Sequence, residues 1–159
     1  MLRDIIAHEQ KAVPAYYKAA AALKTGMGVV VDVTDGTVEL PSAETADNIY
    51  LVDKERVPVG EMAARTQFSD YEAAFNTVAS GEIVKLRHYD AGEEFATDAF
   101  TGSIAKGDYV TVGADGKWKK ATGSTSAVAS RYICVDPAHD DAGHTLLRVL
   151  VQDTAGKNS

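Results

Sequence analysis

Alternation of apolar and other residues is the clearest pattern along this chain. Valines occupy every second position from Val29 to Val33, and the dipeptide Asp35-Gly36 follows. A period of two indicates a β-strand, and Asp-Gly is typical of a tight hairpin turn. Further short apolar runs, bounded by turn residues, lie at 49–52, 82–88, 107–112, 117–121, 130–135 and 146–152. We therefore predict a mainly β fold, either a small β-barrel or a β-sandwich.

One stretch of this pattern occurs twice. The first copy runs from Gly28 to Asp53 and the second from Gly107 to Asp136. Each copy contains Gly-x-x-Val-x-Val, then Asp-Gly, and finally an apolar residue followed by Val-Asp, in the same order. Neither contains a set of residues that performs chemistry. The repeat therefore predicts a scaffold and favours a structural or binding protein over an enzyme.

The β pattern does not extend over the whole chain. We predict an N-terminal arm or short helix over 1–25, a β domain over 26–153 and a flexible tail over 154–159. Leu2, Ile5 and Ile6 lie at helical spacing, and the alanine-rich stretch 15–23 favours helix. Tyr16-Tyr17, preceded by Ala-Val-Pro, suits an extended arm equally well, so both alternatives stay open.

The middle segment 61–79 fits two structures. Tyr71, Phe75 and Val78 recur at helical spacing, which is compatible with a short helix or with a long ordered loop.

Charge and cysteine content exclude several classes of protein. The chain has 159 residues, a formal net charge of −7 and a single cysteine, Cys134. An acidic chain is a poor ligand for the nucleic-acid backbone, so we expect no direct nucleic-acid partner. No run approaches the ~20 apolar residues of a membrane span, and the N-terminus lacks a secretory pattern. We expect synthesis in the cytoplasm, no membrane partner and a buried Cys134.

Candidate catalytic and metal-binding residues are few. His139-Asp140-Asp141-Ala-Gly-His144 could hold a divalent ion, but the same residues fit an acidic turn between two strands. Glu93 and Glu94 are adjacent and point to opposite faces of a strand, so we expect solvated turn charges. Asp53 with Glu55 is as weak a candidate for an acid–base pair as Glu93 with Glu94. We predict no catalytic residue, no metal and no cofactor.

Aromatic and apolar residues outside the clearest strands suggest a docking surface, because tyrosine is enriched at interfaces. Trp118, between two lysines, is expected in the core. The residues predicted to contact a partner or another subunit are Leu2, Ile5, Ile6, Tyr16, Tyr17, Tyr71 and Phe75.

The chain resembles the small head proteins of tailed bacteriophages, the capsid decoration or cement proteins, over roughly 12–153. Glycines, turns and valines carry the resemblance, at 24–28, 36–42, 49–52, 57–59, 106–116 and 145–151. It implies a virion protein on the capsid surface that binds the major capsid protein and stabilises the shell. It also implies a homo-oligomer, with a trimer favoured, and an N-terminal arm lying on the shell. The alternatives are a head-fibre or tail subunit, or a glycan- or ligand-binding β domain that uses Trp118 and exposed tyrosines.

Overall fold

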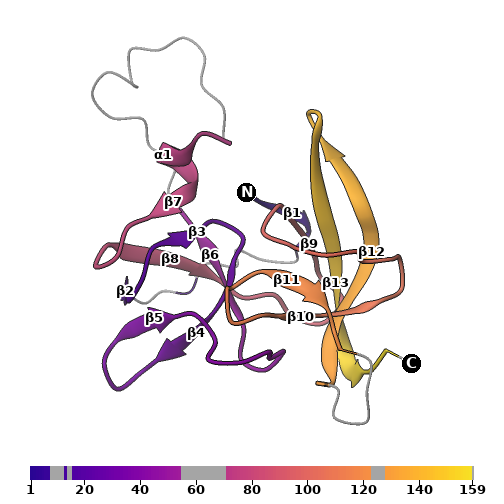
Figure 1. The fold of residues 1–159 in the computed structure, drawn as a ribbon, viewed down its shortest axis with the longest axis horizontal. Coiled ribbons are helices and arrows are strands. Elements are labelled where there is room, and N and C mark those ends of the chain that lie inside the picture. The colour runs from indigo at the N-terminus through magenta and orange to yellow at the C-terminus, as the bar shows by residue number, and fades with distance from the viewer. Residues whose placement is uncertain (8–12, 14–15, 55–70, 123–127, 159) are drawn as a thin grey trace.

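The structure is a computed structural model that describes residues 1–7, 13, 16–54, 71–122 and 128–158 (Figure 1). Strands dominate these residues, and the described helix is the single turn α1 (Ala73–Asn76). The predicted mainly β fold is confirmed. It consists of a closed barrel joined to an open sheet, together with a small two-stranded sheet of β3 (Leu23–Lys24) and β7 (Thr77–Val78).

The barrel is built from short strands with small apolar residues inside. Its strands follow the order β2 (Tyr17–Ala19), β5 (Thr37–Glu39), β4 (Gly28–Asp32), β6 (Tyr50–Asp53) and β8 (Ile83–Arg87). β2 runs parallel to β5, and antiparallel pairing of β8 with β2 closes the barrel. Its core contains Val29, Val38, Val52, Val84 and Leu86.

The open sheet is six-stranded and antiparallel, in the order β1 (Leu2–Ile6), β9 (Glu94–Thr97), β13 (His144–Gly156), β12 (Ser130–Asp141), β10 (Tyr109–Val112) and β11 (Trp118–Lys120). Its longest strands, β12 and β13, form a hairpin that extends beyond the rest of the sheet (Figure 1). Ala142 and Gly143 turn the chain at the tip, both with positive φ.

Both copies of the sequence repeat fold into the same local unit. In the first, β4 lies between β5 and β6, and in the second β10 lies between β11 and β12. Every pairing in the two units is antiparallel. The first unit belongs to the barrel and the second to the open sheet.

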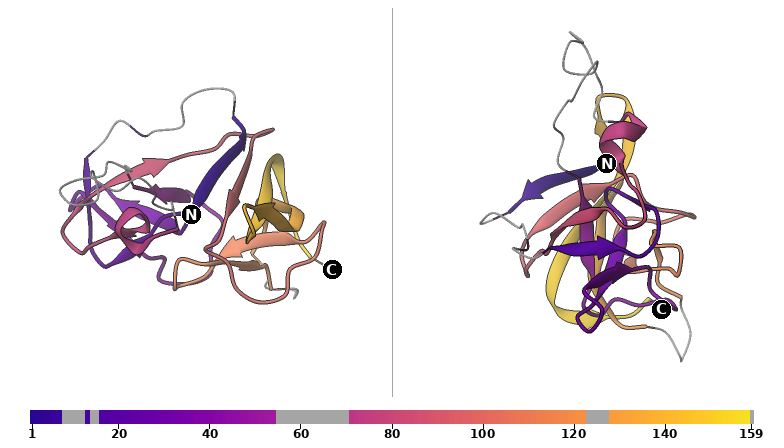
Figure 2. Two further views of the ribbon diagram at one scale, coloured as in Figure 1. Left: turned by 90° about the horizontal axis from the view of Figure 1, so that it is seen from above. Right: turned by 90° about the vertical axis from the view of Figure 1, so that its left-hand side faces the viewer.

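The barrel and the sheet share a hydrophobic cluster. Trp118, Phe95 and Tyr132 from the sheet pack with Ile49 and Leu51 from the barrel side. The two parts lie side by side in Figure 1 and in the left view of Figure 2. The backbones also meet directly, because the Gly28 N–H donates to Gly116 O at 2.9 Å. The barrel and the sheet therefore contribute to a common hydrophobic core.

Both ends of the chain contribute strand residues to the open sheet, which the sequence did not predict. The first residues are extended, and β1 is the edge strand of the open sheet, so 2–6 are neither a helix nor a free arm. The predicted tail is also corrected, since β13 continues to Gly156 and the Asn158 amide donates to the carbonyls of Tyr109 and Ala121. Residues 57–59, which carry part of the resemblance, lie outside the described part.

Residues 61–70 of the predicted middle segment lie outside the described part. In 71–79 the short helix is α1, which contains Phe75 but not Tyr71 or Val78. None of the helices in the described ranges is long and apolar enough to cross a membrane.

Candidate interaction surface

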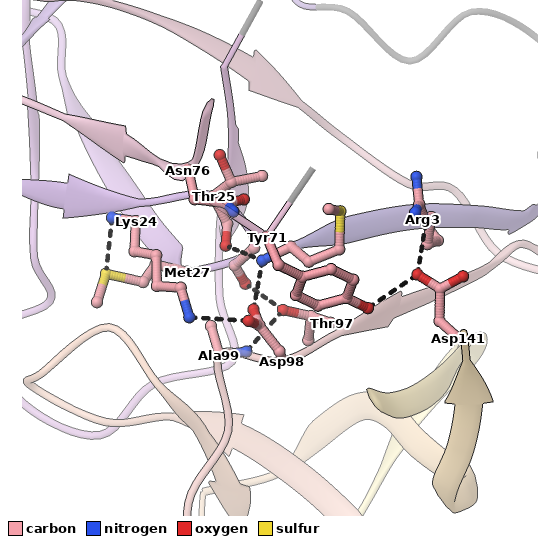
Figure 3. A network of polar contacts seen from close by, with 12 residues as sticks. Arg3, Lys24, Thr25, Met27, Tyr71, Asn76, Thr97, Asp98, Ala99 and Asp141 are labelled. Carbon is pink, nitrogen blue, oxygen red and sulfur yellow. Dashed lines mark hydrogen bonds and ion pairs between the residues drawn. The ribbon is translucent and has the colours of Figure 1, made fainter. Parts of the chain in front are cut away.

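The N-terminus is held inside the structure by a polar network (Figure 3). The Met1 amine donates to Thr25 O at 3.1 Å and pairs with Asp98, which also accepts a 2.8 Å bond from Lys24 Nζ. Met1 is 0% exposed. The buried amine thus has a carbonyl and a carboxylate as partners, which a buried charge requires.

A second part of this network joins β1 to the tip of the β12–β13 hairpin. Asp141 accepts hydrogen bonds from Arg3 Nε at 2.9 Å and from the Tyr71 hydroxyl at 2.8 Å (Figure 3). Burial raises the pKa of Tyr71, and the hydrogen bond to Asp141 raises it further. Burial also acts to raise the pKa of Asp141, but the hydrogen bonds from Tyr71 and Arg3 outweigh it and hold this pKa below its usual value. The Asp141 carboxylate therefore has a structural role, since it holds the hairpin tip against Arg3 and Tyr71.

The candidate metal ligands at this hairpin contact other groups of the protein. The His144 ring stacks on Tyr71, with centroids 3.5 Å apart, and His139 lies 3.9 Å from Asp136. Within the described ranges, no three or more His, Cys, Asp or Glu side chains are grouped as a metal site would need. The residues from His139 to His144 turn the chain at the hairpin tip, and Asp141 joins the turn to Arg3 and Tyr71.

Two of the seven predicted contact residues are corrected. Leu2 is 5% exposed and Phe75 3% exposed, so both are inside the fold. Leu2 packs in the shared cluster, whereas Ile5 packs beside Met1 and Leu146 in a separate cluster. The helical spacing placed Leu2 and Ile5 on one face, but a strand sends side chains to both faces.

The other predicted contact residues keep some surface. Tyr16 is 89% exposed and Ile6 44% exposed. Tyr17 is half-buried against the barrel core, and Tyr71 is half-buried beside His144. Tyr16 is therefore the strongest contact candidate that the sequence proposed.

Tyr16 belongs to a mixed apolar and basic surface on β2 and β8. The Val13 N–H donates to Leu86 O and Tyr17 pairs with Val84, so Tyr16 lies beside the middle of β8. On the paired strands, Lys18 lies opposite Ile83, which is 58% exposed. We call the set Tyr16, Lys18, Ile83 and Lys85 the barrel face. Lys18 and Lys85 form no ion pair with any described residue.

Next to the barrel face, a pocket of about 360 Å³ lies between β1, β6 and β8. We call it the junction cleft; its charged lining residues are Arg3, Asp4, Asp53, Lys54, Lys85 and Arg87. Arg87 Nε donates to Asp53 at 2.8 Å, and its Nη1 pairs with Asp4. Burial acts to lower the pKa of Arg87, but the hydrogen bonds to both carboxylates raise it overall, so the guanidinium stays charged.

Sequence reasoning missed this cleft. Its charges come from β1, from the end of β6 and from β8, which are far apart in the chain. The available signal was the alternation of Lys85 and Arg87 with buried Val84 and Leu86, which predicts a basic outer face of β8.

The prediction that Glu93 and Glu94 are solvated turn charges was wrong for both residues. Glu93 is 0% exposed and accepts the Asp90 N–H at 2.7 Å. Glu94 is 9% exposed and binds Arg148 Nε at 2.6 Å. Asp53 pairs with Arg87, and its suggested partner Glu55 lies outside the described residues. Glu94 lies opposite Leu150 and pairs diagonally with Arg148 on the same strand β13, a contact that a local turn pattern cannot reveal.

The core predictions for Trp118 and Cys134 are confirmed, because both are buried. Burial raises the pKa of the Cys134 thiol to about 11, which suits a core residue rather than a nucleophile. Comparisons of the chain with protein-family models, with curated proteins and with solved structures find no match.

Proposed function

We propose that the protein is a non-catalytic virion component that binds the outside of a phage capsid and stabilises the shell. The resemblance of its glycine and valine pattern to capsid decoration proteins suggests this role. The proposal includes the major capsid protein as partner and a homotrimer as the bound form.

The barrel face is the observation that carries the proposal. Tyr16 and Ile83 are 89% and 58% exposed, and beside them lie Lys18 and Lys85, which have no ion pair among the described residues. Single exposed apolar residues are common, but large ones gathered beside uncommitted charge are typical of interaction surfaces. Tyrosine supplies much contact area at a low entropic cost.

Binding alone is sufficient for this function. A protein that binds the assembled shell and not its separated subunits stabilises the assembly by mass action. At a free concentration of 100 times Kd, the gain is about 2.7 kcal/mol for each site. Such a function needs no reacting group. This agrees with the hydrogen bonds that Asp141, Glu93 and Glu94 accept from other groups of the protein.

The proposal is tested by co-sedimentation with emptied, undecorated heads of the phage that encodes the chain. Removing 1–25 is unsuitable, because β1 and β2 belong to the sheet and the barrel. The test variant is instead Tyr16→Ser with Ile83→Ser, and Tyr16→Phe with Ile83→Val is the matched control. We expect saturable pelleting of the wild type and of the control, and at least tenfold weaker binding of the serine variant.

Absence of wild-type pelleting at any concentration would exclude decoration, and pelleting with tails would assign a different virion subunit. Sedimentation equilibrium of the free protein measures whether it is a trimer.

The structure disfavours the glycan-binding alternative in the form that uses Trp118. The indole is 0% exposed and its Nε1–H donates to Gly26 O at 3.2 Å. A ring enclosed in the core offers no stacking surface to a sugar.

A further inference from the structure

The junction cleft concentrates positive charge in a chain whose formal net charge is −7. Four of its lining side chains are cationic and two are carboxylates. Both carboxylates, Asp4 and Asp53, already pair with Arg87. The remaining cations therefore determine what the cleft attracts.

These cations differ in the number of hydrogen bonds and ion pairs that they already form. Lys54 Nζ donates to Thr77 O and lies 3.4 Å from Glu82, and Arg3 binds Asp141. Lys85 is exposed and has no ion-pair partner in the described ranges. An anion in the cleft would meet Lys85 without breaking an existing pair, so Lys85 is the primary anchor.

The surroundings favour peptide carboxylates over a phosphate. Phosphate sites usually present a helix N-terminus or several convergent backbone N–H groups. The described lining belongs to strands and to the residue after β6. Asp4 and Asp53 would also repel a compact dianion. An extended segment instead spaces its charges and can avoid both carboxylates.

The cleft adjoins an exposed aliphatic side chain, Ile83. Ile83 and Lys85 project from the same side of β8, because alternate residues of a strand share a face and Val84 between them is buried. A bound segment would thus meet a cation and then an aliphatic side chain.

We propose that the junction cleft binds an acidic, extended segment of the shell protein, with its carboxylates on Lys85 and Lys54 and an apolar residue against Ile83. The assignment of the segment to the shell rests on the proposed function. The affinity of the cleft for an acidic peptide does not.

The first experiment uses no capsid. A fluorescent oligo-glutamate peptide is titrated with the full chain at low and at high salt, and anisotropy reports binding. We expect saturable binding that weakens as salt rises, because salt screens exposed charges. Lys85→Glu should weaken binding about fivefold or more, and Lys54→Glu should have a smaller effect. Lys106→Glu, an exposed lysine outside the cleft, makes the same charge change and should leave binding unaltered.

Equal binding by the wild type and the Lys85→Glu variant would overturn the proposal, as would the absence of peptide binding at low salt. Inorganic phosphate that displaces the peptide at equal or lower concentration would assign the cleft to phosphate instead. Thermal unfolding of each variant verifies that it is folded. Since Lys85 is exposed, we expect unfolding temperatures close to that of the wild type.

The second experiment separates the cleft from the function. Heads are pelleted with the wild type, Lys85→Glu and Lys106→Glu. Reduced pelleting of Lys85→Glu alone supports the shell segment as the ligand. Equal pelleting of all three overturns that assignment and leaves decoration intact. Peptide binding without any pelleting of the wild type would exclude decoration while the acidic-peptide site stands.

Discussion

The two copies of the repeat place very different side chains at one equivalent position. Two residues after the turn glycine, the first copy has Val38 and the second has Trp118. Both are 0% exposed, and each lies opposite a valine, Val31 or Val112. Val38 fills the narrow interior of the barrel, whereas Trp118 packs against Phe95 and Tyr132.

The strands added to each unit explain this difference. In the first copy β6 pairs with β8, which returns to β2 and closes a small barrel whose interior has room for valines. In the second copy β12 pairs with the long β13, and the sheet stays open. An open sheet must cover one broad face, and large aromatic rings do so. One local unit therefore supports two kinds of core.

Truncating the two equivalent core residues should give the largest effect. Trp118→Ala removes a ring from the cluster that the barrel and sheet share, and we expect a loss of about 3–5 kcal/mol in the free energy of unfolding. Val38→Ala should cost about 2 kcal/mol, since two methyl groups are lost. Urea denaturation followed by circular dichroism measures both. A single transition in each variant is expected, and two separate transitions would contradict a shared core.

The first glycines of the two copies should respond differently to substitution. A Cβ on Gly28 would lie 2.4 Å from Val112 Cγ2, whereas Gly107 has open space but a φ of +91°. Gly28→Ala should cost about 1–3 kcal/mol through overpacking. Gly107→Ala should cost about 1–2 kcal/mol through backbone strain.

Two further substitutions separate these causes by denaturation. Gly107→Asn should recover stability relative to Gly107→Ala, because asparagine tolerates positive φ. Adding Val112→Ala to Gly28→Ala should cost less than the sum of the two single changes. Strict additivity would show that the contact with Val112 is not the cause.

Glu44 of the first copy forms an ion pair with Lys119 of the second. Its removal should change stability less than the core truncations or the glycine substitutions. Burial acts to raise its pKa, but hydrogen bonds with Lys119, Thr111 and Thr122 lower it to about 2 from 4.5. Because the folded pKa is the lower one, the stabilisation is complete above about pH 4.5 and is lost as the pH falls toward 2. Glu44→Gln should lose about 1 kcal/mol at pH 7.

Denaturation across this pH range provides the measurement. The wild type and Glu44→Gln should converge as the pH approaches 2, when the wild-type carboxyl is protonated. Glu39→Gln alters an exposed carboxylate of the barrel and should run parallel to the wild type. A constant gap between wild type and Glu44→Gln at all pH values would rule out the carboxylate charge as the cause.

The sequence by itself determined the local features of this protein. Alternation at 28–34 and 107–112 specified strands, Asp-Gly specified the two hairpin turns, and the apolar context of Cys134 specified burial. These properties depend on side-chain period and backbone preference within a few residues, which a single sequence displays.

Tertiary structure alone decided the features that need distant residues. Closure of the barrel by β2, the pairing of β1 with β9 and the burial of Glu94 against Arg148 all join separate segments. The junction cleft arises in the same way, because Arg3 and Lys85 meet only when the open sheet packs beside the barrel. Which distant strands pair depends on which arrangement buries more apolar surface and satisfies more polar groups. A local sequence pattern carries no information on competing arrangements of distant segments.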